Sequence, residues 1–165
     1  MLIKILGNIK LQPTICIVHN QPAGWLRIVH NRCFKKNMKK IIVSAAVIIN
    51  NDRILCVQRG DNKLDYISNK FEFPGGKIEP GESPPQAAVR EILEELNMSI
   101  KVEKEFLTVQ HIYPDFHLTM YSYICSSETN EVELSEHISY KWLFKHELQQ
   151  LDWAAADIPI VDKLV

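Results

Sequence analysis

The chain has 165 residues, of which 46% are hydrophobic and 24% charged, and this balance predicts one globular domain with a sizeable core. Polar, charged or proline residues interrupt every apolar run before it reaches the roughly 18 to 20 residues of a membrane-spanning helix, which excludes a transmembrane protein. The four cysteines form no C-x-x-C pair and no zinc-type spacing, so we expect reduced thiols rather than a disulfide scaffold.

Charge is divided unevenly along the chain. Residues 1–37 contain six Lys or Arg residues and no acidic residue, whereas residues 38–165 contain 13 basic and 20 acidic residues. Such a shift marks a boundary, and it predicts a basic N-terminal extension over 1–37, outside a domain over 38–165. A signal peptide or a basic arm that touches nucleic acid fits the extension less well. Met38, followed by two lysines and a strand, looks like a natural start.

From residue 40 onward the pattern predicts strands and helices in a regular order. The first half contains strands at 41–49 and 53–59 around a turn at 50–52, a polar loop at 60–69, a short strand at 71–73 and a backbone turn at 74–76. The second half contains a helix at 83–96, strands at 102–113 and 117–125 around a turn at 114–115, a strand at 138–144, and short helices at 145–151 and 158–164.

The helix at 83–96 has a well-defined start and two distinct faces. Ser83 is the predicted N-cap, with Pro84 at the first helical position and Gln86 completing a capping box. Helical periodicity predicts one packing face, formed by Ala88, Val89, Ile92, Leu93 and Leu96. It also predicts one acidic face, formed by Glu91, Glu94 and Glu95. Taken alone, the acidic face would be a solvated surface, but hard oxygen ligands also suit Mg²⁺ or Mn²⁺.

The residues around the acidic face favour the metal site. The segment from Gly76 to Met98 resembles the Nudix box, G-x5-E-x7-R-E-U-x-E-E-x-G-U with U aliphatic, and departs from it only at Asn97. Asn tolerates the left-handed conformation that the replaced glycine would adopt, so we expect the same geometry there. Residues 71–77 are similar to the corresponding segment of MutT-type nucleoside triphosphate pyrophosphohydrolases, and the resemblance covers roughly residues 40–165.

The resemblance implies a fold and an activity. The implied fold belongs to the α/β class. It is the Nudix α/β/α sandwich, with a mixed, partly antiparallel sheet. The implied reaction uses Mg²⁺ or Mn²⁺ and water to hydrolyse normal or oxidised nucleoside triphosphates to a nucleoside monophosphate and pyrophosphate. The implied partner is a small-molecule nucleotide, without a stable nucleic-acid complex or membrane contact, and the enzyme is expected to be cytoplasmic and monomeric or homodimeric.

The resemblance also implies which residues perform the chemistry. The implied metal ligands are the carboxylates of Glu91, Glu94, Glu95 and Glu136 and the carbonyl of Gly75. Catalysis is assigned to Glu91, Glu94 and Arg90, with Gly76 and Glu82 in supporting positions. One carboxylate orients or deprotonates the attacking water, and the sequence leaves Glu91 and Glu94 open for this role. Glu136 has a second interpretation as a plain loop acid.

Three further residues are predicted to contact the substrate. Arg59 matches a basic residue near the phosphates, Phe73 a residue of the base pocket, and Asp157 the residue that reads the base. A carboxylate accepts hydrogen bonds, so Asp157 would select the donors of cytosine or of guanine, including its 8-oxo form, and both bases stay open. Each residue also has a structural interpretation, as a surface strand end, as core packing and as the N-cap of the last helix, respectively.

Two other functions compete with this prediction. A Nudix hydrolase of another nucleoside diphosphate derivative, such as ADP-ribose, is favoured in part by Pro114, because some of those enzymes carry a proline at this place downstream of the box. The predicted turn explains Pro114 better. A non-catalytic nucleotide-binding module is disfavoured because every carboxylate of the box is present.

Overall fold

The computed structural model describes residues 38–165, so the predicted extension over residues 1–37 lies outside the described residues. The strands are β1 (Lys39–Asn50), β2 (Arg53–Arg59), β3 (Phe71–Glu72), β4 (Gly75–Lys77), β5 (Lys101–Ile112), β6 (Phe116–Ser126) and β7 (His137–Phe144). The helices are α1 (Pro84–Leu96), the 3-10 helix η1 (Lys145–Gln150) and α2 (Ile158–Leu164). The predicted order of strands and helices is confirmed, with one difference at β4.

The sheet is mixed, as predicted, because its central strand β1 has a parallel neighbour on one edge. β1 runs parallel to β6 from the pair Lys39–Phe116 to the pair Ile49–Ser126. The other pairs are antiparallel, namely β1 with β2, β1 with β4, β2 with β3, β2 with β7 and β5 with β6. The hairpin of β1 and β2 is paired only next to its turn, between residues 49–50 and 53–54. Beyond that point β1 has a free edge for another segment.

Strand β4 occupies this edge. Gly75 and Gly76 pair with Ala45 and Ser44, so the prediction that residues 74–76 form only a turn is wrong. Gly75 has φ +147°, and a Cβ atom there would overlap the carbonyl oxygen of Ser44. Only glycine permits this close approach of two backbones. The two glycines therefore join the sheet because they lack side chains.

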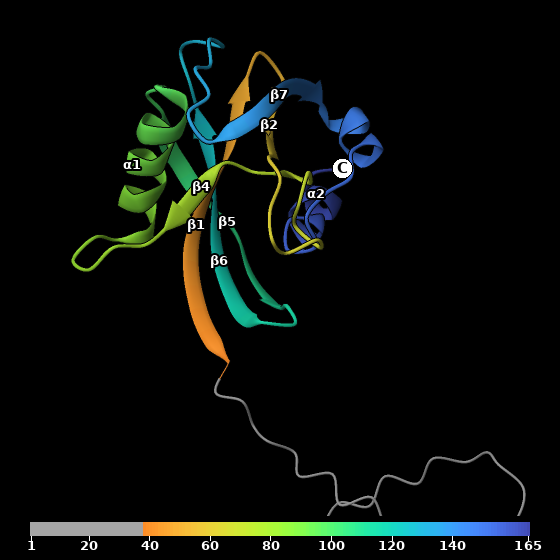
Figure 1. The fold of residues 1–165 in the computed structure, drawn as a ribbon. Helices are drawn as coiled ribbons and strands as arrows, with labels where there is room; N and C mark the ends of the chain where they lie inside the picture. Colours follow the sequence, from red (N-terminus) through yellow and green to blue (C-terminus); the bar gives the residue numbers. More distant parts are fainter. Residues whose placement is uncertain (1–37) are drawn as a thin grey trace, which may run out of the picture. The chain divides into compact units, whose positions relative to one another are not determined.

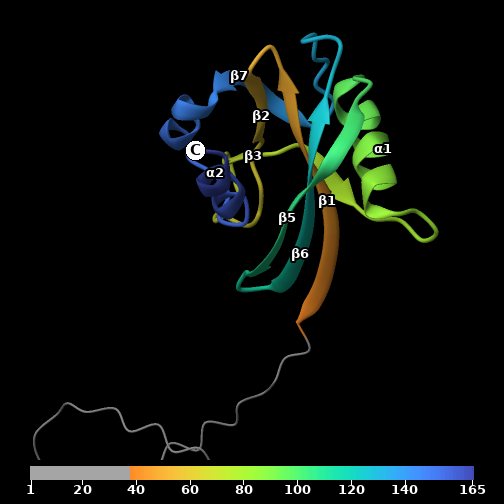
Figure 2. The same cartoon turned by 180° about the vertical axis from the view of Figure 1, so that it is seen from behind.

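Helices cover both faces of the sheet, with α1 on one side and α2 with η1 on the other (Figures 1 and 2). Alternation along β1 places Ala46 and Ile48 in the core under α1, and Ala45 and Val47 in the core under α2. This arrangement confirms the predicted α/β/α sandwich. Among the described residues, no helix combines the length and the apolar character needed to cross a membrane.

Helix α1 is rotated relative to the predicted packing face. Val89 and Leu93 are 38% and 52% exposed, whereas Glu95 is only 7% exposed. The prediction of Val89 and Leu93 as core residues is therefore wrong, because the helix turns its acidic side toward β4. The expectation for Asn97 is confirmed, since this residue ends α1 with φ 49° and ψ 35°.

The close approach of β4 to β1 leads to a stability prediction. Gly75→Ala should lower the free energy of unfolding by about 2 kcal/mol more than Gly81→Ala does. Both glycines have positive φ, but a Cβ at Gly81 would meet no atom within 4 Å, so the difference isolates the overlap with Ser44. Urea unfolding of the two variants measures it. Equal losses would show that the contact between β4 and β1 is not tight.

Candidate active site

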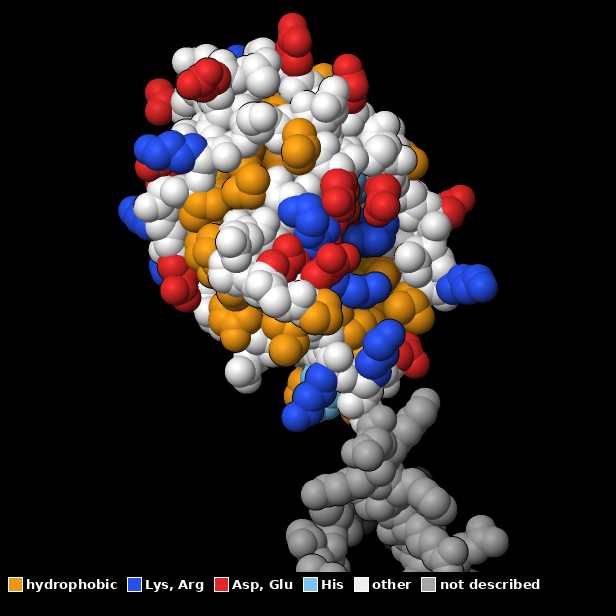
Figure 3. Space-filling model, turned by 90° about the vertical axis from the view of Figure 1, so that its left-hand side faces the viewer, with side chains coloured by type: hydrophobic (Ala, Val, Ile, Leu, Met, Phe, Trp, Pro, Cys, Tyr) orange, Lys and Arg blue, Asp and Glu red, His pale blue; other side chains and the backbone are white. Residues whose placement is uncertain are grey.

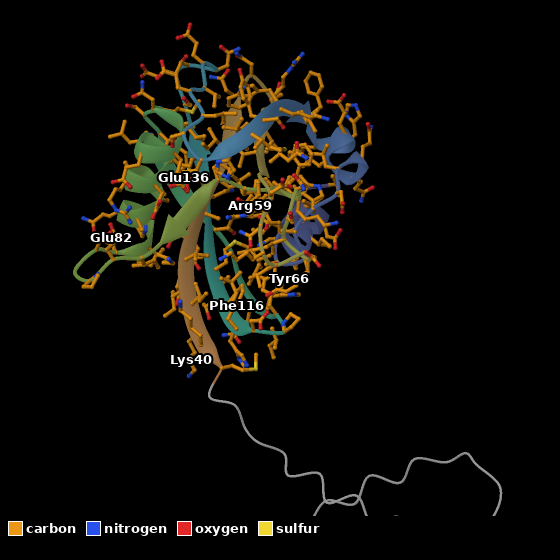
Figure 4. All side chains as sticks on the ribbon, in the orientation of Figure 1. Lys40, Arg59, Tyr66, Glu82, Phe116 and Glu136 are labelled. Carbon is orange, nitrogen blue, oxygen red and sulfur yellow. The ribbon has the colours of Figure 1, made fainter. Side chains whose placement is uncertain are left out.

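The candidate site lies where α1 faces β4 and the start of β7. Figure 4 shows Glu136 close to α1, and Arg59 at the end of β2. Gly76 lies under the carboxylate of Glu91, and a Cβ atom at Gly76 would overlap that carboxylate. The structure therefore brings Gly76 and Glu91 together, and the missing side chain makes room for the acid.

Arg90 is the centre of an ion-pair network on this face. Its Nη2 lies 2.6 Å from Glu82 Oε1 and donates to the carbonyl oxygen of Lys77 at 3.0 Å. Its Nη1 lies 3.1 Å from Glu91 Oε1 and 3.0 Å from Glu94 Oε2. The hydrogen bond from Arg90 holds the pKa of Glu82 below its usual value. Figure 3 shows Lys and Arg side chains placed between Asp and Glu side chains on this face.

Glu95 differs from the other two box glutamates in its burial. Its side chain is almost fully enclosed, and Oε2 has no hydrogen-bond partner among the described residues. Burial raises the pKa of Glu95 to about 7. The charge of His137 acts against this rise, and the charges of Glu91, Glu136 and Glu72 add to it. A buried carboxylate without a partner is costly unless a proton or a cation neutralises it. The carboxylate of Glu95 is therefore a site that would bind either a proton or a cation.

These residues have the donor chemistry for a divalent cation, although the side chains do not enclose one as they stand. Between residues 38 and 165, no three His, Cys, Asp or Glu side chains converge closely enough to hold an ion. One reason is that the Arg90 guanidinium stands beside Glu91 and Glu94. The donors are nevertheless all hard oxygens, and the unpartnered Oε2 of Glu95 marks an uncompensated negative site. The chemistry of the residues therefore fits Mg²⁺ or Mn²⁺, while Arg90 pairs with Glu91 and Glu94 in this structure.

A second network, which sequence reasoning missed, links three neighbouring strands. Glu72 on β3 accepts from Arg59 through Nε at 3.0 Å and Nη2 at 2.9 Å. The same carboxylate lies 3.0 Å from Nε2 of His137, the first residue of β7. The only signal in the sequence was the charged Glu72 between the apolar Phe71 and Phe73. Arg59, predicted near the phosphates, is thus held by a carboxylate.

The predicted base-reading residue lies on the other face of the sheet. Asp157 is 5% exposed, and its Oδ1 accepts the backbone N–H of Phe73 at 3.0 Å. Asp157 is also the N-cap residue of α2, as the alternative interpretation predicted, although its side chain makes no capping hydrogen bond. Burial first, and then the charge of Glu72, raises the pKa of Asp157 well above its usual value. A protonated Asp157 could donate as well as accept.

The aromatic residues around Asp157 form a packed wall. Phe73 is buried and stacks on Trp153 with ring centroids 4.8 Å apart. Its ring is therefore part of the hydrophobic core. Tyr113 accepts the N–H of Ala156 at 3.1 Å and stacks on Tyr66 at 5.0 Å. The loop at 60–69, predicted only as polar, is thereby joined to the segment that carries Asp157.

Comparisons with known proteins agree with this geometry. The NUDIX domain family matches residues 39–164. The chain is 33% identical over 128 residues to the 8-oxo-dGTP diphosphatase of Escherichia coli strain K12, which covers 77% of this chain and 98% of that protein. It is 34% identical over 137 residues to the CTP pyrophosphohydrolase of the same strain, which covers 76% and 91%. The solution structure of the E. coli ORF135 protein matches with a TM-score of 0.65 and 32% identity, over 77% of this chain and 89% of that one.

The chain therefore belongs to the NUDIX family and is a Nudix hydrolase. This confirms the resemblance that the box predicted.

The burial of Glu95 leads to a pH prediction for the metal-free protein. The pKa of Glu95 in the folded state, about 7, exceeds the ordinary value of 4.5, so folding favours the protonated form. Stability is then lost as pH rises from about 4.5 to about 7. Glu95→Gln mimics the protonated acid, and should raise the free energy of unfolding at pH 8 by up to about 3 kcal/mol but change it little at pH 5.

Thermal unfolding in the presence of a chelator, at both pH values, measures this difference. Addition of Mg²⁺ should reduce the difference at pH 8, because the cation neutralises Glu95 in the unsubstituted protein. An equal effect of Glu95→Gln at both pH values would contradict the raised pKa.

Proposed function

We propose that this chain hydrolyses normal or oxidised (deoxy)nucleoside triphosphates to a nucleoside monophosphate and pyrophosphate, with Mg²⁺ or Mn²⁺ as cofactor. The observation that carries the proposal is the arrangement of the box carboxylates on α1, where the carboxylate of Glu91 lies over Gly76 and Glu95 is buried with an unpartnered Oε2. The two E. coli relatives are named for activities on 8-oxo-dGTP and CTP, and these names support the substrate class.

The reaction requires positioning and charge neutralisation more than covalent chemistry from the protein. We assign the cation to Glu91, Glu94, Glu95, Glu136 and the carbonyl of Gly75. When bound, it neutralises charge on the phosphate oxygens and orients water. The water attacks phosphorus, one P–O bond of the anhydride breaks, and the water's oxygen stays on one product while a carboxylate accepts a proton.

The proton acceptor in this proposal is Glu91 or Glu94. The side chain of Glu91 is 16% exposed and that of Glu94 is 59% exposed. Geometry favours Glu91, because a shielded carboxylate beside Gly76 has less competition from bulk water. Arg90 forms ion pairs with both acids and with Glu82, and its positive charge offsets the repulsion among the three carboxylates.

The nucleotide would extend from this acidic face to Asp157. We propose that Arg59 contacts the phosphates and that Asp157 reads the base, with cytosine and guanine both as candidates. Pro114 lies in the turn between β5 and β6, where Tyr113 donates to the carbonyl oxygen of Phe116 at 2.9 Å. The turn accounts for Pro114, so this proline does not require ADP-ribose or another different substrate.

The remaining parts of the proposal concern the whole protein. We propose that residues 38–165 are the catalytic domain, that the enzyme is cytoplasmic and monomeric or homodimeric, and that it forms no stable nucleic-acid complex. The family match over 39–164 supports the domain boundary.

The function is tested by assaying pyrophosphate release from a panel of nucleoside triphosphates, including 8-oxo-dGTP and CTP, and AMP release from ADP-ribose, with Mg²⁺ present and absent. We expect pyrophosphate release only with the cation. Glu94→Gln should lower kcat by about 100-fold or more, because a neutral amide cannot balance a cation's charge. The matched control is Glu128→Gln, because Glu128 is also exposed and lies outside the site.

Both variants should keep the melting temperature of the unsubstituted chain. Near-normal turnover in Glu94→Gln would contradict the assignment of the site. Hydrolysis of ADP-ribose alone would contradict the substrate class, and no hydrolysis of any nucleotide would favour a binding module.

Base selection is tested at Asp157 with two substitutions. Asp157→Asn keeps an acceptor for the Phe73 N–H but not the ionisable group, and should lower kcat/KM for cytosine or guanine nucleotides by about 10- to 100-fold. A uracil nucleotide, which presents fewer donors, should change little. Asp157→Ala should instead lower the free energy of unfolding by about 1 to 3 kcal/mol, because it leaves a buried N–H unpaired.

Steady-state kinetics on the three bases and thermal unfolding distinguish the two roles. If Asp157→Asn lowered activity equally on all bases, Asp157 would have only its structural role.

A further inference from the structure

Three side chains form a continuous hydrogen-bonded chain across β3, β2 and β7. Arg59 donates from Nε and Nη2 to Oε2 of Glu72, and Nη2 also lies 2.7 Å from Oε1. His137 Nε2 approaches Oε1 of the same carboxylate at 3.0 Å. Because an ionised carboxylate only accepts hydrogen bonds, the proton of this contact is on Nε2.

The chain runs from the interior of the protein to its surface. The side chains of His137 and Glu72 are 5% and 14% exposed, whereas that of Arg59 is 40% exposed. A β-bulge between Gln58 and Arg59 shifts the register with β7, and it pairs Arg59 with His137. Bulges commonly redirect a side chain next to an active site. The buried members are thus placed to fix the direction of the exposed one.

The network lies between the two ends of the candidate site. His137 follows Glu136, one of the proposed metal ligands, directly in the chain, and the N–H of Ser135 donates to the carbonyl oxygen of Glu95 on α1 at 3.0 Å. Glu72 precedes Phe73, whose backbone N–H donates to Asp157 Oδ1 at 3.0 Å. The network therefore adjoins both the acidic face of α1 and the proposed base-reading residue. A nucleotide that spans these two ends would pass the guanidinium of Arg59.

We propose that His137 is a positioning residue, which holds the carboxylate of Glu72 so that Glu72 orients the guanidinium of Arg59 toward the substrate's phosphates. This inference rests on the proposed hydrolysis of nucleoside triphosphates. Glu72 occupies the Nε–Nη2 edge of the guanidinium and leaves the Nη1 edge for a phosphate oxygen. A guanidinium held in advance loses less freedom when the substrate binds.

The first experiment compares two amides at position 137. The side-chain nitrogen of Gln reaches the place of Nε2, whereas that of the shorter Asn reaches only the place of Nδ1. His137→Gln should keep kcat/KM within about threefold of the unsubstituted enzyme, whereas His137→Asn and His137→Ala should lower it by about tenfold or more. The control is His146→Asn, an exposed histidine on η1, which should leave activity unchanged.

The second experiment asks whether His137 acts through Arg59. Arg59→Ala should lower kcat/KM, and adding His137→Ala to that variant should cause no further loss beyond about twofold. Two independent roles would instead give a product of the two losses. A purely structural role would lower the melting temperature but give independent losses in the cycle.

A third measurement does not depend on the substrate. The side-chain Nε–H of Arg59, assigned by its absence in Arg59→Lys, should give an ordered, slowly exchanging ¹⁵N NMR signal. His137→Asn should remove its protection from exchange, and His137→Gln should retain it. If the enzyme hydrolysed no triphosphate but the NMR result held, the proposed function would fail while the positioning of Arg59 by His137 would stand.

Three outcomes overturn the positioning role. They are equal activity of the Gln and Asn variants, independent losses in the double-substitution cycle, and unchanged protection of the Arg59 signal in His137→Asn. If His137→Ala does not fold, the Gln and Asn variants decide the question, and failure of all three to fold would make His137 a structural residue.

Discussion

The close approach of the Gly75–Gly76 backbone to β1 is the constraint on which the rest of the site depends. Side chains at either position would overlap an existing group, the carbonyl of Ser44 on one side and the carboxylate of Glu91 on the other. Because neither glycine has a side chain, β4 can pair with β1 in the sheet and α1 can pack directly against β4. Glu91 and Glu95 are thereby largely shielded from water, whereas Glu94 stays exposed.

That placement has an electrostatic cost, which the surrounding residues partly offset. Arg90 compensates Glu82, Glu91 and Glu94 with one guanidinium, whereas Glu95 remains buried without a partner. An uncompensated carboxylate in this position destabilises the metal-free fold and strengthens the attraction for a cation. The same burial thus weakens the fold and prepares the proposed chemistry.

The sandwich separates the two tasks of the proposed enzyme on two faces of one sheet. The α1 face carries the box glutamates, and the α2 face carries Asp157 with Phe73 and Trp153. Strands β3 and β7 both pair with β2, and there Glu72 joins Arg59 to His137. In the proposed function, separate elements would bind the base and the phosphates of the nucleotide, and the sheet fixes the relative position of those elements.

Local chemistry in the sequence was sufficient for the order of elements, the left-handed Asn97 and the family, because caps, turns and the box depend on residues close together in the chain. Tertiary structure alone decided which side of α1 is buried, because helical periodicity carries no information about the elements that pack against the helix. In the folded protein Leu93 is exposed and Glu95 is buried. Tertiary structure also brought His137 to Glu72 and Asp157 to Phe73, across 65 and 84 residues of sequence. Contacts at such separations depend on strand register and sheet topology, which no local pattern encodes.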